Sequence, residues 1–228
     1  MLKNPFSQLS KKDFIVWGIS LFVVGVSILL SPNVSLTTLL ASLLGVTALI
    51  FLAKGDVWGQ FLSMIFALLY AVTSFSFRYY GEVMTYMFMT FPSALACAIS
   101  WLRHPYKGNA NQVAISRLTP LQKAILPPLA ILVTVVFYFL LGALGTPNLI
   151  FSTLSILTSF TASYLTFFRN PYYAVAYSFN DIVLIVLWTL ASIEDPSYTP
   201  MILCFAMFLV NDIYGFVSWK IREKKQSE

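Results

Sequence analysis

The hydrophobic pattern consists of eight long apolar runs separated by short polar stretches. A helix that crosses a lipid bilayer needs about 20 mostly apolar residues, and these runs have that length. Six of them contain no charged residue, and none shows the shorter alternating pattern of a transmembrane β-barrel. The sequence therefore predicts eight transmembrane helices, over Phe14–Leu30, Leu36–Ala53, Val57–Phe77, Val83–Leu102, Ala124–Gly142, Leu149–Phe168, Tyr172–Ser192 and Met201–Trp219.

Composition supports the same class of protein. Of the 228 residues, 58% are hydrophobic and 10% are charged, whereas a soluble domain has about 45–50% apolar and about 25% charged residues. A soluble chain of this size cannot bury so much apolar surface in one core. This excludes a water-soluble enzyme or nucleic-acid-binding domain despite the net charge of +5. We expect an integral membrane protein, with the lipid bilayer as a partner and no nucleic acid.

The distribution of Lys and Arg predicts the orientation, because cytoplasmic loops retain these residues. With eight helices and the N-terminus inside, 13 of the 14 Lys and Arg residues lie on the cytoplasmic side and only Arg78 lies outside. The outer loops would carry Glu82, Glu194 and Asp195. The first run is interpreted as a helix rather than a cleaved signal peptide, because no small-residue cleavage site follows it. Both termini are therefore predicted to be cytoplasmic.

An internal repeat is predicted by sliding the chain against itself. A shift of 118 residues lays Leu36–Trp101 over Leu154–Trp219 without a gap, with three apolar runs in phase. Chance spacing of similar helices is the alternative. The repeat predicts an all-α membrane protein with two parallel three-helix units joined by a linker helix, and a site between them near the midplane. The predicted division is 1–34 (extra helix), 35–103 (first unit), 104–147 (basic loop and linker helix) and 148–228 (second unit and basic tail).

Two aspartates lie deep in apolar runs, and each follows an asparagine: Asn180–Asp181 and Asn211–Asp212. An ionised side chain at the bilayer centre costs at least about 2.5–3.5 kcal/mol. The pairs therefore predict a polar pocket or a polar seam between the last two helices. The alternative is that they only hydrogen-bond to neighbouring helices. Amides and flat aromatic rings in such a pocket suit a planar heteroaromatic ligand.

Other residues indicate what the chain does not do. The single histidine lies in a basic loop, both cysteines fall inside apolar runs, and no phosphate-binding glycine loop is present. We expect no metal site, disulfide, cofactor or ATP coupling. Trp17, Trp101 and Trp219 lie near the ends of predicted helices, where tryptophans favour the membrane interfaces.

Four stretches resemble the PnuC family of bacterial vitamin transporters, in particular its nicotinamide riboside branch. They are WGQFLSMIFALLYAV, YYGEVMTYMFMTFPSALACAISW, FNDIVLIVLWTLAS and FLVNDIYGFVSWK. The resemblance covers Leu36 to Lys220, and the final N-D-x-Y-G-x-x-x-W element is its most specific part.

The resemblance implies a fold like that of the SWEET sugar transporters, assembly as a homotrimer and location in the bacterial cytoplasmic membrane. It implies facilitated diffusion of nicotinamide riboside, thiamine, riboflavin or a deoxynucleoside, followed by trapping through a cytosolic kinase. The two units cannot contribute equally to the site, because Pro92–Ser93 stands where the second unit has Val210–Asn211. Carried over onto matching positions, the substrate-binding residues are Trp58, Gln60, Tyr70, Asn180, Trp188, Asn211 and Tyr214, to which Asp181 is added for its depth.

The leading hypothesis is a nicotinamide riboside uniporter that is not an enzyme. A second is proton-coupled transport in which Asp181 or Asp212 titrates. A third is a membrane-embedded enzyme or the binding subunit of a larger transporter, although two deep carboxyl groups without an intramembrane histidine fit an enzyme poorly.

Overall fold

The structure is a computed structural model that describes residues 4–31, 36–76 and 80–228. Within these residues, eight helical segments are long and apolar enough to cross a membrane, which confirms the predicted all-α membrane class. Phe77, the predicted end of the third segment, and Arg78 lie outside the described residues. The helices are α1 (Lys11–Leu29), α2 (Leu36–Ala53), α3 (Trp58–Ser76), α4 (Tyr80–Thr85), α5 (Phe91–Arg103), α6 (Pro120–Ala143), α7 (Leu149–Phe167), α8 (Tyr173–Glu194) and α9 (Thr199–Ser227), with short turns η1 (Pro5–Gln8) and η3 (Pro196–Tyr198).

Helix ends follow from local sequence signals. Ser10 and Asp13 form a reciprocal capping box at the start of α1, and Thr119 with Gln122 does the same for α6. Each box satisfies two backbone N–H groups that the first turn of a helix leaves without partners. Pro120 occupies the first position of α6, where a missing N–H costs nothing.

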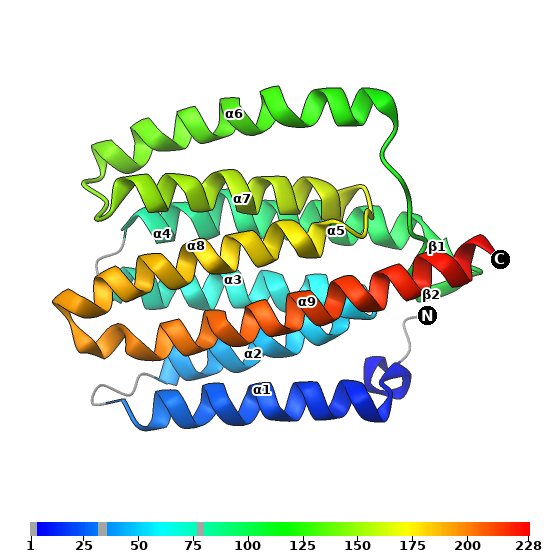
Figure 1. The fold of residues 1–228 in the computed structure, drawn as a ribbon, viewed down its shortest axis with the longest axis horizontal. Helices are drawn as coiled ribbons and strands as arrows, with labels where there is room; N and C mark the ends of the chain where they lie inside the picture. Colours follow the sequence, from blue (N-terminus) through cyan, green and yellow to red (C-terminus); the bar gives the residue numbers. More distant parts are fainter. Residues whose placement is uncertain (1–3, 32–35, 77–79) are drawn as a thin grey trace.

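The helices lie side by side along the long axis of the molecule (Figure 1). α2 packs against α3 and α9, α8 packs against α7 and α9, and α1 covers α2 and α9. α6 lies at one edge, where it packs against α7 and leaves most of its apolar side chains exposed. Three spanning segments thus stand between α1 and α6 and three follow α6. An internal axis relating these two sets stays a prediction.

The fourth spanning segment is not a regular helix. α4 and α5 are joined through a π-helical turn, η2 (Tyr86–Thr90), and Pro92 stands at the start of α5. The sequence-based placement of Glu82 in an outer loop is wrong, because this residue lies on α4 and is 3% exposed. A π-helical turn adds a residue to the helix and often accompanies a functional site.

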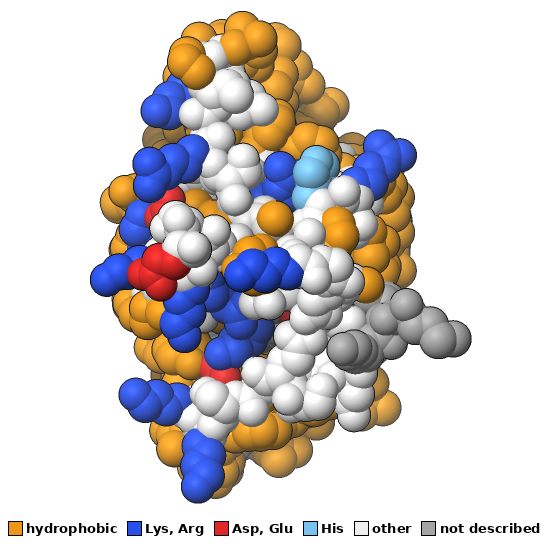
Figure 2. All heavy atoms as spheres, turned by 90° about the vertical axis from the view of Figure 1, so that its right-hand side faces the viewer, with side chains coloured by type: hydrophobic (Ala, Val, Ile, Leu, Met, Phe, Trp, Pro, Cys, Tyr) orange, Lys and Arg blue, Asp and Glu red, His pale blue; other side chains and the backbone are white. Residues whose placement is uncertain are grey.

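The end of the molecule that carries both termini is basic (Figures 1 and 2). The predicted basic loop holds a small β-hairpin that the hydrophobic pattern did not predict, with β1 (Pro105–Tyr106) and β2 (Asn109–Val113). Its turn needs positive φ at Lys107 and Gly108, with values of 47° and 74°. We call this face, which Figure 2 shows rich in Lys and Arg side chains, the basic end.

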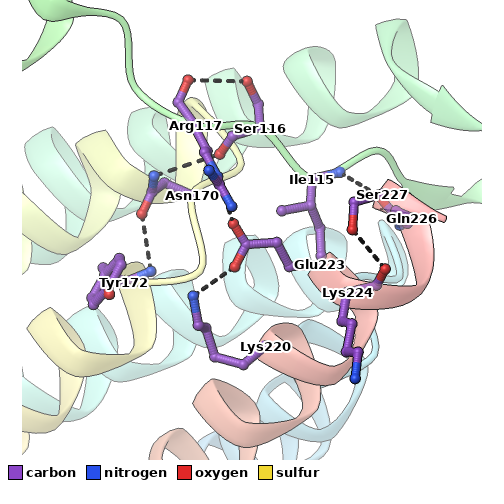
Figure 3. A network of polar contacts seen from close by, with 10 residues as sticks. All are labelled: Ile115, Ser116, Arg117, Asn170, Tyr172, Lys220, Glu223, Lys224, Gln226 and Ser227. Atoms are coloured by element: carbon purple, nitrogen blue, oxygen red, sulfur yellow. Dashed lines mark hydrogen bonds and ion pairs between the residues drawn. The ribbon is translucent and has the colours of Figure 1, made fainter.

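The C-terminal part of α9 is tied to the segment that precedes α6 (Figure 3). Glu223 pairs with Arg117 at 3.0 Å and with Lys220 at 2.6 Å. Gln226 accepts the Ile115 N–H at 2.8 Å and donates to the Val113 carbonyl at 3.2 Å. The side-chain amide of Gln226 thereby hydrogen-bonds to the backbone at the end of β2 and just beyond it, and these bonds anchor the segment before α6 to α9.

Candidate functional site

A cavity lies in the interior of the helix bundle. All six spanning segments other than α1 and α6 contribute residues to its wall. Its volume, counted as the space that the centres of water molecules can reach, is about 110 Å³. Since one water needs roughly 10–15 Å³ by this measure, the cavity has room for several. Its position between the segments before α6 and those after it is where a transporter with two halves binds its ligand.

Each helix turns one face toward the cavity. Tyr177, Asn180, Asp181 and Leu184 follow at the three- and four-residue spacing that places side chains on one side of α8. The same spacing relates the lining residues of α9, which are Phe205, Phe208 and Asp212. The segment α4–η2–α5 contributes Glu82, Thr85, Tyr86, Thr90, Ser93, Ala94 and Cys97, so its lining residues run through the π-helical turn.

Aromatic rings form one part of the wall. The centroid of the Phe66 ring lies 5.8 Å from those of Tyr86 and Phe208. Gly45 makes this arrangement possible, because a Cβ at this position would lie 2.5 Å from Cζ of Phe208 and 3.1 Å from the Phe66 ring. Clustered rings of this kind offer flat faces on which a planar ligand can stack.

Hydroxyl and amide groups form another part. Ser155, Ser159, Ser163 and Thr166 line the cavity as a row along α7. Ser155 and Thr166 donate to carbonyls of their own helix at 2.8 Å, which leaves their oxygens able to accept a hydrogen bond. On other helices, Asn180 Oδ1 accepts the Thr158 hydroxyl at 2.9 Å, and the buried Gln60 Nε2 has no hydrogen-bond partner among the described residues.

Three carboxyl groups also face the cavity. Glu82, Asp181 and Asp212 come from α4, α8 and α9, and they are 3%, 3% and 4% exposed. The carboxyl groups of Asp181 and Asp212 lie within hydrogen-bonding reach of each other. Two carboxyl groups can share a hydrogen bond only when one of them carries a proton. The predicted polar pocket between α8 and α9 is therefore present.

A buried aromatic cluster separates the cavity from the basic end. Trp219 on α9 donates its indole N–H to the Leu52 carbonyl at 2.8 Å, and Trp101 on α5 donates to the Thr166 carbonyl at 3.0 Å. Each tryptophan thus joins the last spanning segment of one set to the end of the first helix of the other set. Tyr173 adds a second donor to the Leu52 carbonyl, at 3.2 Å. We call Trp101, Trp219 and Tyr173 the aromatic closure.

The expectation that Trp101 and Trp219 lie at the membrane interface is wrong. They are 1% and 0% exposed, and their ring centroids are 5.6 Å apart. Burial with a satisfied indole N–H explains the position, since the carbonyls at helix ends need donors. Trp17 is half-buried and donates to the Thr47 hydroxyl at 3.1 Å.

The predicted site residues fall into three groups in this structure. Gln60, Asn180 and Asp181 line the cavity. Tyr70 lies behind the wall, with its ring centroid 4.2 Å from that of Tyr86 and its hydroxyl within hydrogen-bonding reach of Trp188. Trp188 is 1% exposed in the same core cluster.

The remaining three predicted residues are not among those that line the cavity. Trp58 stands at the start of α3, and its ring centroid is 5.7 Å from that of Phe61. Asn211 donates to the Ser20 hydroxyl of α1 at 2.8 Å. Tyr214 donates to Asp13, also on α1. Their predicted contact with substrate stays a prediction.

Asp13 is a buried charged residue that the sequence analysis did not single out. It is 0% exposed and pairs with Lys54 at 2.7 Å, so it holds α1 to the turn between α2 and α3. Asp56 in the same turn is 1% exposed and accepts the Trp58 N–H at 3.0 Å. Burial raises the pKa of Asp56 above its ordinary value, and the hydrogen bonds from Trp58 and Asn111 oppose part of that rise. α1 is thus attached by specific polar contacts.

Several lining residues escaped the sequence analysis. The hydroxyl row of α7 carries a signal that was available, because Ser155, Ser159, Ser163 and Thr166 recur at helical spacing in an apolar run. Glu82 and Tyr86 carried none, since the π-helical turn shifts the faces of that segment. Among the described residues, no group of His, Cys, Asp and Glu could hold a metal ion.

Comparisons with known proteins agree with this architecture. A nicotinamide riboside transporter PnuC of Neisseria mucosa is 25% identical over 191 residues, covering 82% of this chain and 73% of the relative. A protein of the same name from Haemophilus influenzae is 22% identical over 221 residues, covering 96% and 94%. The fold matches the crystal structure of a vitamin B3 transporter PnuC with a TM-score of 0.83 and 23% identity, over 97% of this chain and 95% of that one.

The model of the family described as nicotinamide mononucleotide transporter matches residues 35–221. This range starts just before α2 and ends inside α9, so it takes in every helix that lines the cavity and leaves out α1. The chain therefore belongs to the nicotinamide mononucleotide transporter family, which is a family of transporters and not of enzymes.

Proposed function

We propose that this protein carries nicotinamide riboside across the membrane through the cavity between its two sets of helices. The observation that carries the proposal is the composition of the wall. Stacked aromatic rings suit the flat nicotinamide ring, and the hydroxyl row of α7 with Gln60 and Asn180 suits an amide and a ribose. Both relatives named above are nicotinamide riboside transporters, which supports the same substrate class here.

The wall favours the riboside over the mononucleotide named by the family description. A phosphate group in a protein site is usually held by Arg, Lys or backbone N–H groups. Among the described residues that line the cavity, none is Lys, Arg or His, and three are carboxylic acids. A bound phosphate would lack a positive partner and would be repelled by these acids. The same wall leaves thiamine as the next candidate, followed by riboflavin and a deoxynucleoside.

Transport requires that the cavity open alternately to the two sides. At the basic end this means separating the aromatic closure, whose indole hydrogen bonds join the two sets of helices. No nucleotide-binding motif is present in the sequence, so we propose facilitated diffusion, with a cytosolic kinase that phosphorylates the riboside and prevents its return.

The charged and apolar parts of the surface support proposals for the orientation of the protein in the membrane and for its assembly. We propose that the basic end faces the cytoplasm of a bacterial cell and that both termini lie there, because cytoplasmic loops retain Lys and Arg. We also propose the homotrimer implied by the family resemblance. The exposed apolar side of α6, which includes Ile131, Val135 and Phe139, supports contact with lipid or with another copy.

Uptake by purified protein in liposomes tests the proposal. We expect saturable entry of labelled nicotinamide riboside down its gradient and no entry of nicotinamide mononucleotide. Asn180→Leu should abolish uptake, because the amide on the wall is lost. Thr189→Val is the matched control, since Thr189 is an exposed residue of the same helix. Preference for the mononucleotide, or no uptake of the riboside by folded protein, would overturn the proposal.

Proton-coupled transport is a second candidate, favoured by the contact between Asp181 and Asp212. A proton shared by two carboxyl groups can be released when the ligand or the conformation changes. In the same liposomes, an inward proton gradient would then drive nicotinamide riboside above its external concentration. Asp212→Asn would remove this accumulation. Equal final concentrations with and without the gradient would exclude coupling.

A further inference from the structure

We propose that Glu82, Asp181 and Asp212 select a ligand whose aromatic ring carries a positive charge. The inference rests on the proposed function and deepens it, because the pyridinium ring of nicotinamide riboside is such a cation. The selection would be by charge, in addition to the shape and hydrogen bonding of the wall.

The three carboxyl groups are buried in one cavity, and none of the described residues that line it is Lys, Arg or His. The carboxyl groups come from three helices, and each is less than a twentieth exposed. In the described part of the chain, the acidic members of the ion pairs are Asp13 and Glu223, both outside the cavity. No ion pair with a described residue neutralises the carboxyl groups of the cavity.

One carboxyl oxygen in the cavity also lacks a hydrogen-bond donor. The Oδ2 atom of Asp181 is buried and has no hydrogen-bond partner among the described residues. Burying an ionised carboxylate without a partner costs several kcal/mol. Such a cost is offset when a cationic ligand enters, so part of the binding free energy would come from its charge.

The aromatic rings that line the cavity would also contribute to binding a cation. Tyr86 lines the same cavity as Glu82 and Asp181, which come from different helices. Phe66 lies in edge contact with Tyr86 at 5.8 Å between ring centroids. A cation over the face of such a ring is attracted by its π electrons. A flat cation stacked on these rings would therefore share the cavity with the three carboxyl groups.

The sharpest test compares two ligands that differ in charge and keep the same sugar and amide. These are nicotinamide riboside and dihydronicotinamide riboside, its reduced and uncharged form. Binding to the purified full chain is measured by calorimetry for wild type, Asp181→Asn, Asp212→Asn and Glu82→Gln. Glu194→Gln is the matched control, because it removes the same charge from an exposed residue outside the cavity.

We expect wild type to bind the cation on the order of 10- to 100-fold more tightly than the neutral form, the range given by one desolvated charge-assisted contact. The preference should narrow in at least one of the three cavity variants and stay unchanged in Glu194→Gln. Equal affinity of wild type for both forms would overturn the inference. An unchanged preference in all three variants, shown to be folded by thermal unfolding, would overturn it as well.

A second pair of ligands separates an error in the proposed substrate from an error in the proposed charge selection. If wild type binds neither form of the riboside, the same comparison is made with thiamine, which carries a thiazolium cation, and its neutral isostere deazathiamine. Preference for thiamine over deazathiamine would support charge selection while rejecting nicotinamide riboside as the substrate. Equal binding of these two would reject charge selection independently of the vitamin.

Discussion

The cavity and the aromatic closure are neighbouring parts of one helix bundle, and they differ in whether their buried polar groups have hydrogen-bond partners. In the closure, the indoles of Trp101 and Trp219 donate to carbonyls at helix ends. In the cavity, Gln60 Nε2 and Asp181 Oδ2 are buried without a partner among the described residues. Both regions share Leu52 and Thr166, whose carbonyls accept the indoles and which also line the cavity.

This difference indicates that the aromatic closure stabilises the fold, whereas the cavity keeps polar groups available for a ligand. A buried donor with a hydrogen-bond partner contributes to the stability of the fold. A buried donor without a partner lowers that stability, and a ligand that accepts its hydrogen bond gains binding free energy. Substitutions in the closure should therefore lower stability first, and substitutions of polar cavity residues should lower binding with little loss of stability. Three predictions test that contrast.

Trp219→Ala should have the largest effect. It removes a side chain that is 0% exposed and leaves a void among Tyr173, Trp101 and Leu52. A truncation of this kind costs about 3–5 kcal/mol of unfolding free energy. Thermal unfolding in detergent measures the loss, and Phe139→Ala, on the exposed side of α6, serves as the control. A midpoint like that of wild type would show that the closure does not hold the two sets of helices together.

Gly45→Ala should have an intermediate effect on stability and a strong effect on binding. The added Cβ would lie 2.5 Å from Phe208, so the ring must move into the cavity or the helices must separate. Overpacking of this size costs about 1–3 kcal/mol. Gly25→Ala is the control, because its nearest neighbour would be Leu43 at 3.9 Å. Unchanged uptake in Gly45→Ala would mean that the aromatic wall does not contact the ligand.

Gln60→Met should have the smallest effect on stability. The shape is nearly kept, and the lost amide donor has no partner among the described residues, so the unfolding midpoint should stay the same or rise. Nicotinamide riboside uptake should nevertheless fall, on the order of tenfold for one lost hydrogen bond to the ligand. A fall in stability without a fall in uptake would reverse the contrast between the two regions.

Much of the architecture was predictable from local pattern. Apolar runs long enough to cross a bilayer predict the eight spans, because lipid requires every backbone group to be satisfied within a helix. The depth of Asp181 and Asp212 predicts a polar pocket between α8 and α9, and both residues line the cavity. Gln60 and Asn180, which the family resemblance implied as site residues, also lie on its wall.

The rest of the site depends on contacts between segments far apart in the chain. Asn211 and Tyr214 share the helix of Asp212, yet they meet Ser20 and Asp13 because α1 covers that side of α9. Glu82 reaches the cavity in a segment that contains a π-helical turn. Periodicity identifies the residues on one face of a helix and does not identify the neighbour of that face.

The class of the protein, its spanning segments and the depth of Asp181 and Asp212 follow from the sequence, because each reflects the cost of placing a side chain in lipid. Which polar side chains meet in the cavity depends on how the helices pack against one another. The same packing places Trp101 and Trp219 in a buried closure rather than at the membrane interface. The physical reason is that a buried donor goes to whichever carbonyl the packing of helices brings near, and that carbonyl lies 65 residues away for Trp101 and 167 for Trp219.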